Sequence, residues 1–422
     1  MKHLTHTLFF FLLTAQICFG QWYPQNSGTT QNLSKVQFVD ANTGWAVGDS
    51  GLILHTSNGG VDWIQQASGT NLKLVDISFV DANTGWVLAS DWHPNYKSIL
   101  LKTINRGLDW IQQMQDTLLF SAVFFIDENI GWLVGGGIIL KTTDGGNIWI
   151  PKTPGPGEDE ISDVKFLDPF TGFVVGYYWT ILKSTDGGDN WIFQMGHSYV
   201  GGFDRISFSN LDNGFVIGEG GQAFPSPLLY RTTNGGAEWL YIYPSPFAKY
   251  KDIYSINSNI VYIVGLSFSI PQVGTVLKSS DAGTTWDEQL FEIDKAFNGV
   301  QFVDENIGWV VGDNGTILHT TNGGVSFVDD ETTQPTDFIL EQNYPNPFNP
   351  STKISWQSPV GSHQTLKVFD VLGNEIATLV DEYKPAGRYE VEFNAAVLPS
   401  GVYFYQLRAG TFVETKKMIL IR

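Results

Sequence analysis

The chain has 422 residues, of which 45 are glycine and 14% are aromatic. This composition favours a soluble, turn-rich β-protein of two or three domains. The formal net charge is −19, with −18 in residues 21–330 and −2 in residues 331–422, so neither part has the positive surface that a nucleic-acid-binding protein needs.

Residues 1–20 are predicted to be a signal peptide. Lys2 supplies the positive start, Leu8–Leu13 the apolar centre, and "CFG" the small residues before a cleavage site at Gln21. The apolar run is too short to span a membrane and no later run is long enough, with an uncleaved anchor as the alternative. Cys18 is the only cysteine and would leave with this segment, so we expect no disulfide, cysteine-ligated metal or cysteine nucleophile.

The chain then continues with a stretch that is repeated later. "WYPQNSGT" from Trp22 to Thr29 and "WIQQASGT" from Trp63 to Thr70 are identical at five of eight positions. The first of these stretches therefore looks like the last strand of a repeat unit, placed before the first complete unit.

One pattern recurs from residue 36 to residue 327. It reads Val-x-Phe-Val-Asp, a turn, Gly-Trp-x-Val-Gly, a second turn, an apolar run, and a closing box Thr-x-Asn-Gly-Gly-x-x-Trp. The box occurs seven times, and its terminal aromatic residues are Trp63, Trp110, Trp149, Trp191, Trp239, Trp286 and Phe327.

Each unit offers four short strands with alternating or fully apolar patterns, separated by Gly, Asn and Asp turns. Such a sheet cannot bury both faces alone, but radially stacked sheets cover one another. We therefore predict an all-β fold, in which residues 21–328 form a seven-bladed β-propeller. The last unit lacks an outer strand, so we expect a strand near residues 22–26 to pair with it and close the ring. Phe327 and Trp22 then compete for one box position.

The closing box has a local structural explanation. Its Asx side chains can accept backbone N–H bonds within the turn, and the glycine two residues later can take a positive φ without steric cost. The predicted structural Asx residues are Asn58, Asn105, Asp144, Asp186, Asn234, Asp281 and Asn322. A recurring turn aspartate, as at Asp40, has the same kind of role.

These motifs resemble Asp-box (BNR) repeats, and more closely the YCF48-like family of photosystem II assembly factors. The resemblance covers residues 22–327 and implies a seven-bladed propeller, but fold alone does not fix function. Family members with the photosystem role are associated with a run of arginines on one face, and this acidic chain has no such run.

A linker at residues 329–337 precedes a domain at residues 338–422 whose sequence pattern differs from that of the repeats. Alternation in "LKVFDV" and "VYFYQL" predicts a small antiparallel β-sandwich. Four ordered motifs, Asn343–Pro350, Gly387–Tyr389, Leu398–Leu407 and Lys416–Lys417, resemble the type A sorting domain of the type IX secretion system. The resemblance implies a bacterium of the Bacteroidetes/Chlorobi type, contact with the secretion machinery, and a secreted or surface-attached product. An ordinary adhesive β-domain is the alternative.

Sialidases also carry Asp-boxes, so an enzyme is an alternative. The Asp-box resemblance to sialidases implies three arginines that clamp a carboxylate, yet residues 21–330 contain only Arg106, Arg205 and Arg231. Of these, only Arg205 lies on an inner strand, where it could face a central site. His55 and His319 occupy a position that other units fill with Lys or Arg, and we expect these side chains to lie across the box aromatic. We predict no catalytic residues, no metal site and no cofactor.

Differences among the units indicate where a ligand would bind. The long, aromatic connections lie on one face, and exposed rings there could stack on sugars or anchor a protein, although packing between loops is the alternative. The candidate ligand-binding residues are Trp92, His93, Tyr96, Tyr177, Tyr178, Trp179 and Arg205. We therefore expect a secreted or cell-surface, non-enzymatic binder of a protein or glycan. An extracellular glycoside hydrolase and a photosystem II assembly factor are the alternatives.

Overall fold

The computed structural model describes residues 22–91, 96–152, 160–196, 201–220, 226–242, 248–267, 272–290, 294–324 and 337–421. The chain divides into two compact units, Met1–Ser326 and Phe327–Arg422. The regular elements of the described residues are strands and two single 3-10 turns, η1 (Asp49–Gly51) and η2 (Asp313–Gly315). Within these ranges no helix has the length and apolar character needed to cross a membrane.

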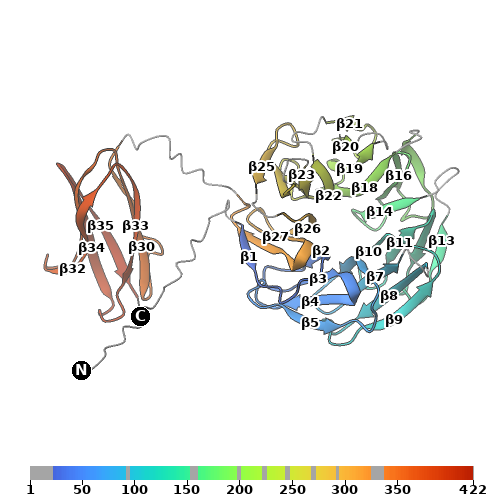
Figure 1. Ribbon diagram of the computed structural model, residues 1–422, viewed down its shortest axis with the longest axis horizontal. Helices are drawn as coiled ribbons and strands as arrows, with labels where there is room; N and C mark the ends of the chain where they lie inside the picture. The colour runs from blue at the N-terminus through green and yellow to red at the C-terminus, as the bar shows by residue number, and fades with distance from the viewer. Residues whose placement is uncertain are drawn as a thin grey trace, which may run out of the picture. The chain divides into compact units, whose positions relative to one another are not determined.

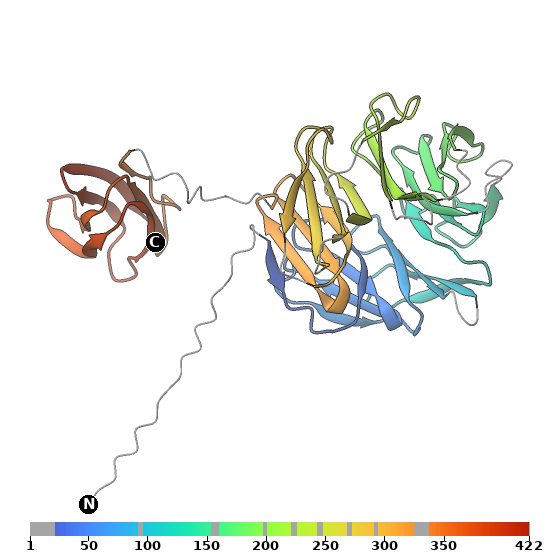
Figure 2. The same cartoon turned by 45° about the horizontal axis from the view of Figure 1, so that its top comes forward.

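The first unit contains seven four-stranded antiparallel sheets, arranged as blades around a common centre (Figure 1; Figure 2). Blade 1 consists of β2 (Leu33–Phe38), β3 (Gly44–Gly48), β4 (Leu52–Thr56) and β5 (Ile64–Ala67). Blade 2 consists of β6 (Leu74–Phe79), β7 (Gly85–Asp91), β8 (Lys97–Thr103) and β9 (Ile111–Asp116). Blade 3 consists of β10 (Ala122–Phe125), β11 (Gly131–Gly135), β12 (Ile138–Thr142) and β13 (Ile150–Lys152). Blade 4 consists of β14 (Ile161–Phe166), β15 (Gly172–Gly176), β16 (Thr180–Ser184) and β17 (Ile192–Met195). Blade 5 consists of β18 (Gly202–Phe208), β19 (Gly214–Gly220), β20 (Ser226–Thr232) and β21 (Leu240–Tyr241). Blade 6 consists of β22 (Ala248–Ser255), β23 (Val261–Ser267), β24 (Gly274–Ser279) and β25 (Asp287–Leu290). Blade 7 consists of β26 (Phe297–Phe302), β27 (Ile307–Gly312), β28 (Ile317–Thr321) and β1 (Tyr23–Gln25).

The N-terminal strand closes the ring. Strand β1 pairs antiparallel with β28, with Tyr23 opposite His319, and the innermost strands contact one another in a closed cycle in which β26 meets β2. Trp22 is only 2% exposed and its ring meets Phe302 edge-on at 5.8 Å. Trp63 meets Phe38 in the same way in blade 1. Trp22 therefore fills the box-aromatic position of blade 7, while Phe327 lies outside the described residues.

Neighbouring blades are joined by stacked aromatic rings. Trp45 of β3 stacks on Phe79 of the next blade with the ring centroids 3.6 Å apart, and Trp110 then meets Phe79 edge-on at 5.9 Å. A Cβ on Gly44 would lie 2.5 Å from the Phe38 ring, so the glycine of each Gly-Trp pair leaves space for a ring. Aromatic contacts of this kind add about 0.5–1.5 kcal/mol per pair beyond the burial of apolar area, and the repeat provides one set at almost every blade interface.

The closing box is a self-contained turn. In blade 1, Thr56 Oγ1 accepts the N–H of Gly60 at 2.9 Å and Asn58 Oδ1 accepts the N–H of Asp62 at 3.0 Å. Gly60 has a φ of +88°, which a residue with a Cβ would resist. The same Oδ1 bond is made by Asn105, Asp144, Asp186, Asn234 and Asp281, while Asn322 bonds Thr320. These Asx side chains therefore have a structural explanation.

The cationic position before each box differs from our expectation. Lys102 Nζ lies 4.8 Å from the ring centre of Trp86, a Gly-Trp aromatic, rather than across the box aromatic. It also donates to the carbonyl of Gly145 in the next blade at 2.9 Å. His55 and His319 likewise lie against Trp45 and Trp309. Because the long side chain runs back along the blade, it ties two blades together instead of covering the outer ring.

The second unit is a β-sandwich, as predicted. One sheet has the order β29 (Ile339–Leu340), β30 (Ser351–Ser358), β33 (Gly387–Asn394), and the other β32 (Glu375–Lys384), β31 (Ser362–Phe369), β34 (Gly401–Ala409), β35 (Phe412–Leu420). The proline-rich segment before β30 is part of the core of this second unit. Phe348 is 2% exposed and hydrogen-bonds β35, and buried Asn343 bonds Thr352 and Tyr405.

Candidate ligand-binding site

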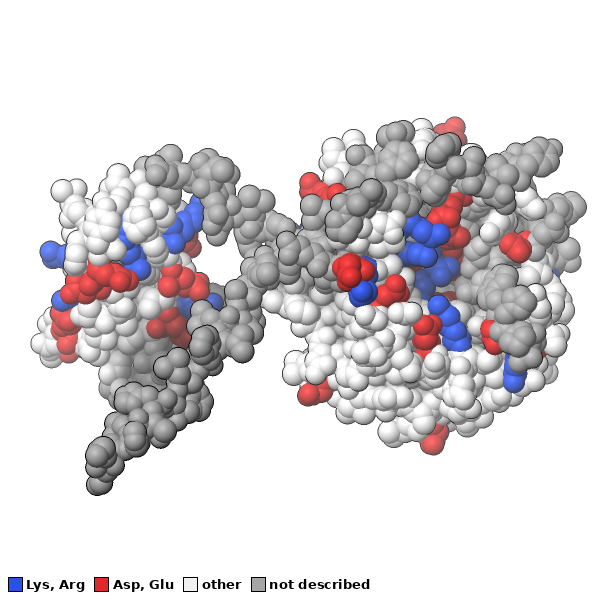
Figure 3. Space-filling view, in the orientation of Figure 1, with Lys and Arg blue, Asp and Glu red and all other residues white. Residues whose placement is uncertain are grey.

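Charged side chains gather in the hollow at the centre of the propeller (Figure 3). They come from one position of the innermost strands, next to a bulge that recurs in β2, β6, β14, β18, β22 and β26. A bulge re-aims side chains locally. Lys35 Nζ and Asp252 Oδ1 are 2.7 Å apart, and Arg205 Nε lies 3.9 Å from the same oxygen. The channel is thus lined by mutually paired charges.

The channel aspartates also bind the backbone of the following blade. Asp76 Oδ2 accepts the N–H of Val123 at 2.8 Å, and Asp163 Oδ2 accepts the N–H of Ile206 at 3.0 Å. Asp252 Oδ2 accepts an N–H of blade 7 in the same way at 3.1 Å. These carboxylates lie in alternate blades, and their hydrogen bonds give each a structural role.

Burial in the channel raises the pKa of Asp76 from 3.8 to about 6, although the charge of Lys35 opposes the shift. Between these two pH values the folded chain binds one more proton than the unfolded chain, so this group's contribution to stability falls as the pH rises. We expect Asp76→Asn to remove that loss, because an amide oxygen can still accept the Val123 N–H. The free energy of unfolding at neutral pH should rise by on the order of 1 kcal/mol, and that at about pH 4 should rise by much less.

Urea unfolding at the two pH values measures this effect. Asp116→Asn is the matched control, because Asp116 forms an Asx turn with Leu118 that an asparagine can also form. Equal stability changes for both variants, or a loss of stability at neutral pH in Asp76→Asn, would contradict the assigned burial cost.

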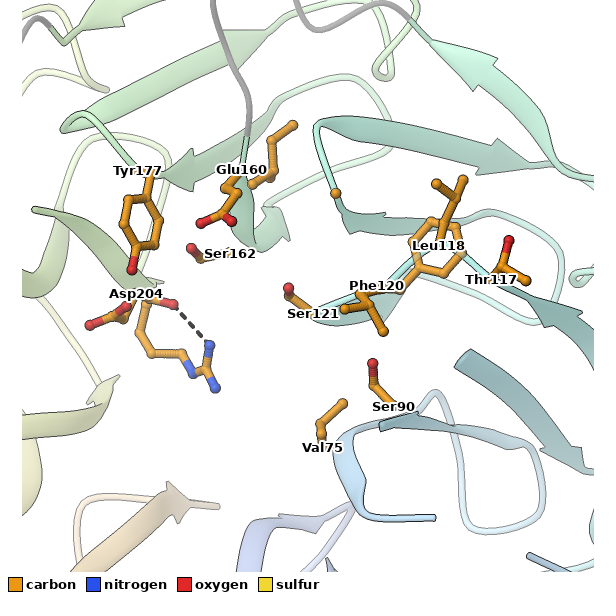
Figure 4. Close-up of a pocket in the computed structure, with 14 residues that line it drawn as sticks. Val75, Ser90, Thr117, Leu118, Phe120, Ser121, Glu160, Ser162, Tyr177 and Asp204 are labelled. Atoms are coloured by element: carbon orange, nitrogen blue, oxygen red, sulfur yellow. Dashed lines mark hydrogen bonds between the residues drawn. The ribbon is translucent and has the colours of Figure 1, made fainter. Parts of the chain in front are cut away.

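A pocket of about 540 Å³ lies at the channel mouth, on the face formed by the connections between the second and third strands and between blades. We call it the mouth pocket. Figure 4 shows that its lining falls into two groups, a polar one and a largely apolar one across the opening. The polar group includes Glu160, Ser162, Tyr177 and Asp204, and the other group includes Val75, Ser90, Leu118, Phe120 and Ser121. Arg205 also lines the pocket, next to Asp204.

The polar side of the mouth pocket is acidic. Burial raises the pKa of Asp204, an effect that Arg205 partly offsets. Burial and the nearby carboxylates of Glu160 and Asp204 raise the pKa of Tyr177. Arg205 donates to the backbone carbonyl of Asp204 at 2.9 Å, and despite burial the carboxylates of Asp163 and Asp252 raise its pKa. The guanidinium is therefore already compensated by protein groups.

Tyr177 is presented by a tight turn with an uncommon backbone. Thr180 N–H donates to the carbonyl of Tyr177 at 3.1 Å, and the two residues between them, Tyr178 and Trp179, have φ of 57° and 62°. Left-handed residues other than glycine are uncommon and cluster at functional sites. The turn leaves Tyr177 47% exposed, whereas Trp179 packs into the blade 5 core near Tyr230.

The candidate ligand-binding residues that the sequence predicts lie in different surroundings in the structure. Tyr177 and Arg205 line the mouth pocket, and Tyr178 is exposed beside Tyr177. Tyr96 is 49% exposed but does not line this pocket, and Trp179 faces the core. Trp92 and His93 lie outside the described residues.

Sequence reasoning missed Glu160, Asp204 and Leu118. Each of these residues lies at or just before an innermost strand and differs from the residues at the equivalent positions of the other repeat units. That difference could have indicated them. In the part of the chain that the structure describes, no group of three His, Cys, Asp or Glu side chains could hold a metal ion.

Two family profiles match the chain. The profile described as "Photosynthesis system II assembly factor YCF48" matches residues 15–119 and 154–290, more than half of the chain. The profile described as "Secretion system C-terminal sorting domain" matches residues 342–421, so this tail marks the chain for export to the cell surface or the medium. Among curated proteins, none matches.

Solved structures share the propeller fold. The chain is 18% identical to a YCF48 bound to D1 peptide, with a TM-score of 0.57 over 72% of this chain and 98% of that one. YCF48 from Cyanidioschyzon merolae gives 18% identity and a TM-score of 0.56 over 71% and 98%. The GH74 xyloglucanase from Xanthomonas campestris gives 13% identity and a TM-score of 0.58 over 80% of this chain and 59% of that one. At these identities the likeness is one of fold.

Proposed function

Because this chain belongs to the YCF48 family of photosynthesis system II assembly factors, we propose that its propeller is a binding module that holds a segment of another protein at the mouth pocket. The sorting tail supports a function at the cell surface or in the medium. A photosystem role fits this chain poorly, because it is exported and has no run of arginines.

The two-sided lining of the mouth pocket carries the proposal. Leu118, 36% exposed, and Val75 offer apolar area, while Tyr177 and the acidic groups opposite offer polar contacts. An extended peptide presents both kinds of side chain together with backbone N–H and C=O groups, and an exposed tyrosine is a common anchor for such contacts. A YCF48 relative has been solved with a bound D1 peptide, which supports a peptide over a glycan.

An array of synthetic dodecapeptides, with a glycan array beside it, tests this function. We expect peptide binding that weakens about tenfold or more in Tyr177→Ala and in Leu118→Ser, since buried anchor residues dominate such interfaces. Tyr96→Ala is the control, because Tyr96 is exposed to a similar degree outside the pocket. Binding to glycans alone, or peptide binding equal in all variants, would contradict the proposal.

A glycoside hydrolase is the second candidate. Glu160 and Asp204 both line the mouth pocket, and burial raises the pKa of Asp204, as a general acid requires. We nonetheless propose binding without catalysis, because the family match and the relative solved with a bound peptide both favour a peptide ligand. A panel of chromogenic glycosides decides this point, and turnover lost in Asp204→Asn would favour the hydrolase.

A further inference from the structure

We propose that the mouth pocket selects a basic side chain, Lys or Arg, in the bound segment. This inference rests on the proposed peptide-binding function and names the group that the pocket recognises. Its basis is a cavity that joins two carboxylates, an exposed aromatic ring and an apolar wall.

The charge balance around the pocket favours a cation. In the channel, Lys35, Lys165 and Arg205 match the carboxylates Asp76, Asp163 and Asp252 in number. Glu160 and Asp204 are additional. Among the described residues, no Lys or Arg nitrogen lies within ion-pairing distance of either side-chain carboxylate. Lys249 and Lys251 also act on Asp204, and Lys249 pairs with Glu219. Counted together, Glu160, Asp204 and Glu219 exceed these two lysines by one, so the polar side of the mouth pocket has a surplus of one negative charge.

Tyr177 adds an aromatic surface beside these carboxylates. The ring of Tyr177 is 47% exposed and lies on the same side of the pocket as Glu160 and Asp204 (Figure 4). A cation over an aromatic ring gains about 0.5–1 kcal/mol at an exposed site and more when desolvated. The neighbouring carboxylates act in the same direction, because they also attract a cation. An anionic ligand would meet repulsion from both carboxylates.

The opposite wall of the pocket is largely apolar. Val75 and Leu118 offer apolar surface across the opening from the carboxylates (Figure 4). Lys and Arg bury their aliphatic stems on apolar surface while the charged end reaches a polar group. The two halves of the mouth pocket therefore match the two halves of one long basic side chain.

The test uses the tightest-binding peptide of the dodecapeptide array. Each of its Lys and Arg residues is replaced in turn by Gln, and affinity is measured for the wild-type chain, Glu160→Gln and Asp204→Asn. We expect one replacement to weaken binding about tenfold, or about 1.4 kcal/mol. The same replacement should cost much less in either variant, because the charge partner is already gone. Glu128→Gln, an equal charge change at an exposed position on the opposite face, is the control.

The outcomes separate this inference from the proposed function. A peptide that binds through Tyr177 with no sensitive basic residue would leave the function standing and overturn the charge preference. A preference for acidic residues would overturn it as well and point to Arg205. Failure of every peptide to bind would overturn both.

Discussion

A chain that ends at Asp337 should not appear outside the cell. The removed residues include the whole segment that matches the sorting domain, and their core shares no residue with the blades. That core contains Phe348, Trp356 and Tyr405, whereas the blade clusters hold residues 22–318. Because the two units have separate cores, the propeller should fold without the tail, and the expected loss is one of export alone.

Expression of the full and truncated chains in a host with a type IX secretion system measures this effect. We expect the truncated chain to remain in the cell envelope, with nearly complete loss from the surface and medium. Its thermal unfolding temperature and its peptide binding should match those of the propeller in the full chain. Truncated protein in the medium at the level of the full chain would contradict the assignment of the tail.

The fold was predictable because the residues that set the ring contacts and the box turn recur in each repeat unit. In blade 1 the ring of Phe38 meets Trp63 edge-on and occupies the space that a Cβ on Gly44 would need. The box turn is closed by hydrogen bonds of Thr56 and Asn58 within the turn itself. Copies of these signals predicted the seven blades and the all-β class. The Lys102 position was predicted wrongly in detail, because the repeat pattern does not say which of two nearby rings a long side chain reaches.

The candidate site was predictable only in part. An aromatic loop that interrupts the repeat indicated Tyr177, and a lone arginine on an innermost strand indicated Arg205. The same reasoning could not separate Tyr177 from Trp179, because the left-handed turn at Tyr178 and Trp179 sends one ring outward and the other into blade 5. Leu118 lies far from both in sequence, and only the radial arrangement of the blades brings it to the same pocket.

Trp22 should be among the most costly residues to truncate. It is 2% exposed, packs edge-on against Phe302 and donates to Gln289 in the neighbouring blade. Trp22→Ala should lower the free energy of unfolding by about 3–5 kcal/mol, the range for a buried Trp or Phe changed to Ala. Trp63 has the same edge-on contact in blade 1 but is only half-buried, so Trp63→Ala should cost less.

The loop face and the channel mouth exist only if the ring is closed by the strand at Tyr23–Gln25. The most direct test is urea unfolding of the full chain, followed through the propeller transition, for wild type, Trp22→Ala and Trp63→Ala. The closed ring predicts that Trp22→Ala is destabilised more than Trp63→Ala. A Trp22→Ala chain as stable as wild type, with Trp63→Ala destabilised, would show that the N-terminal strand does not close the propeller.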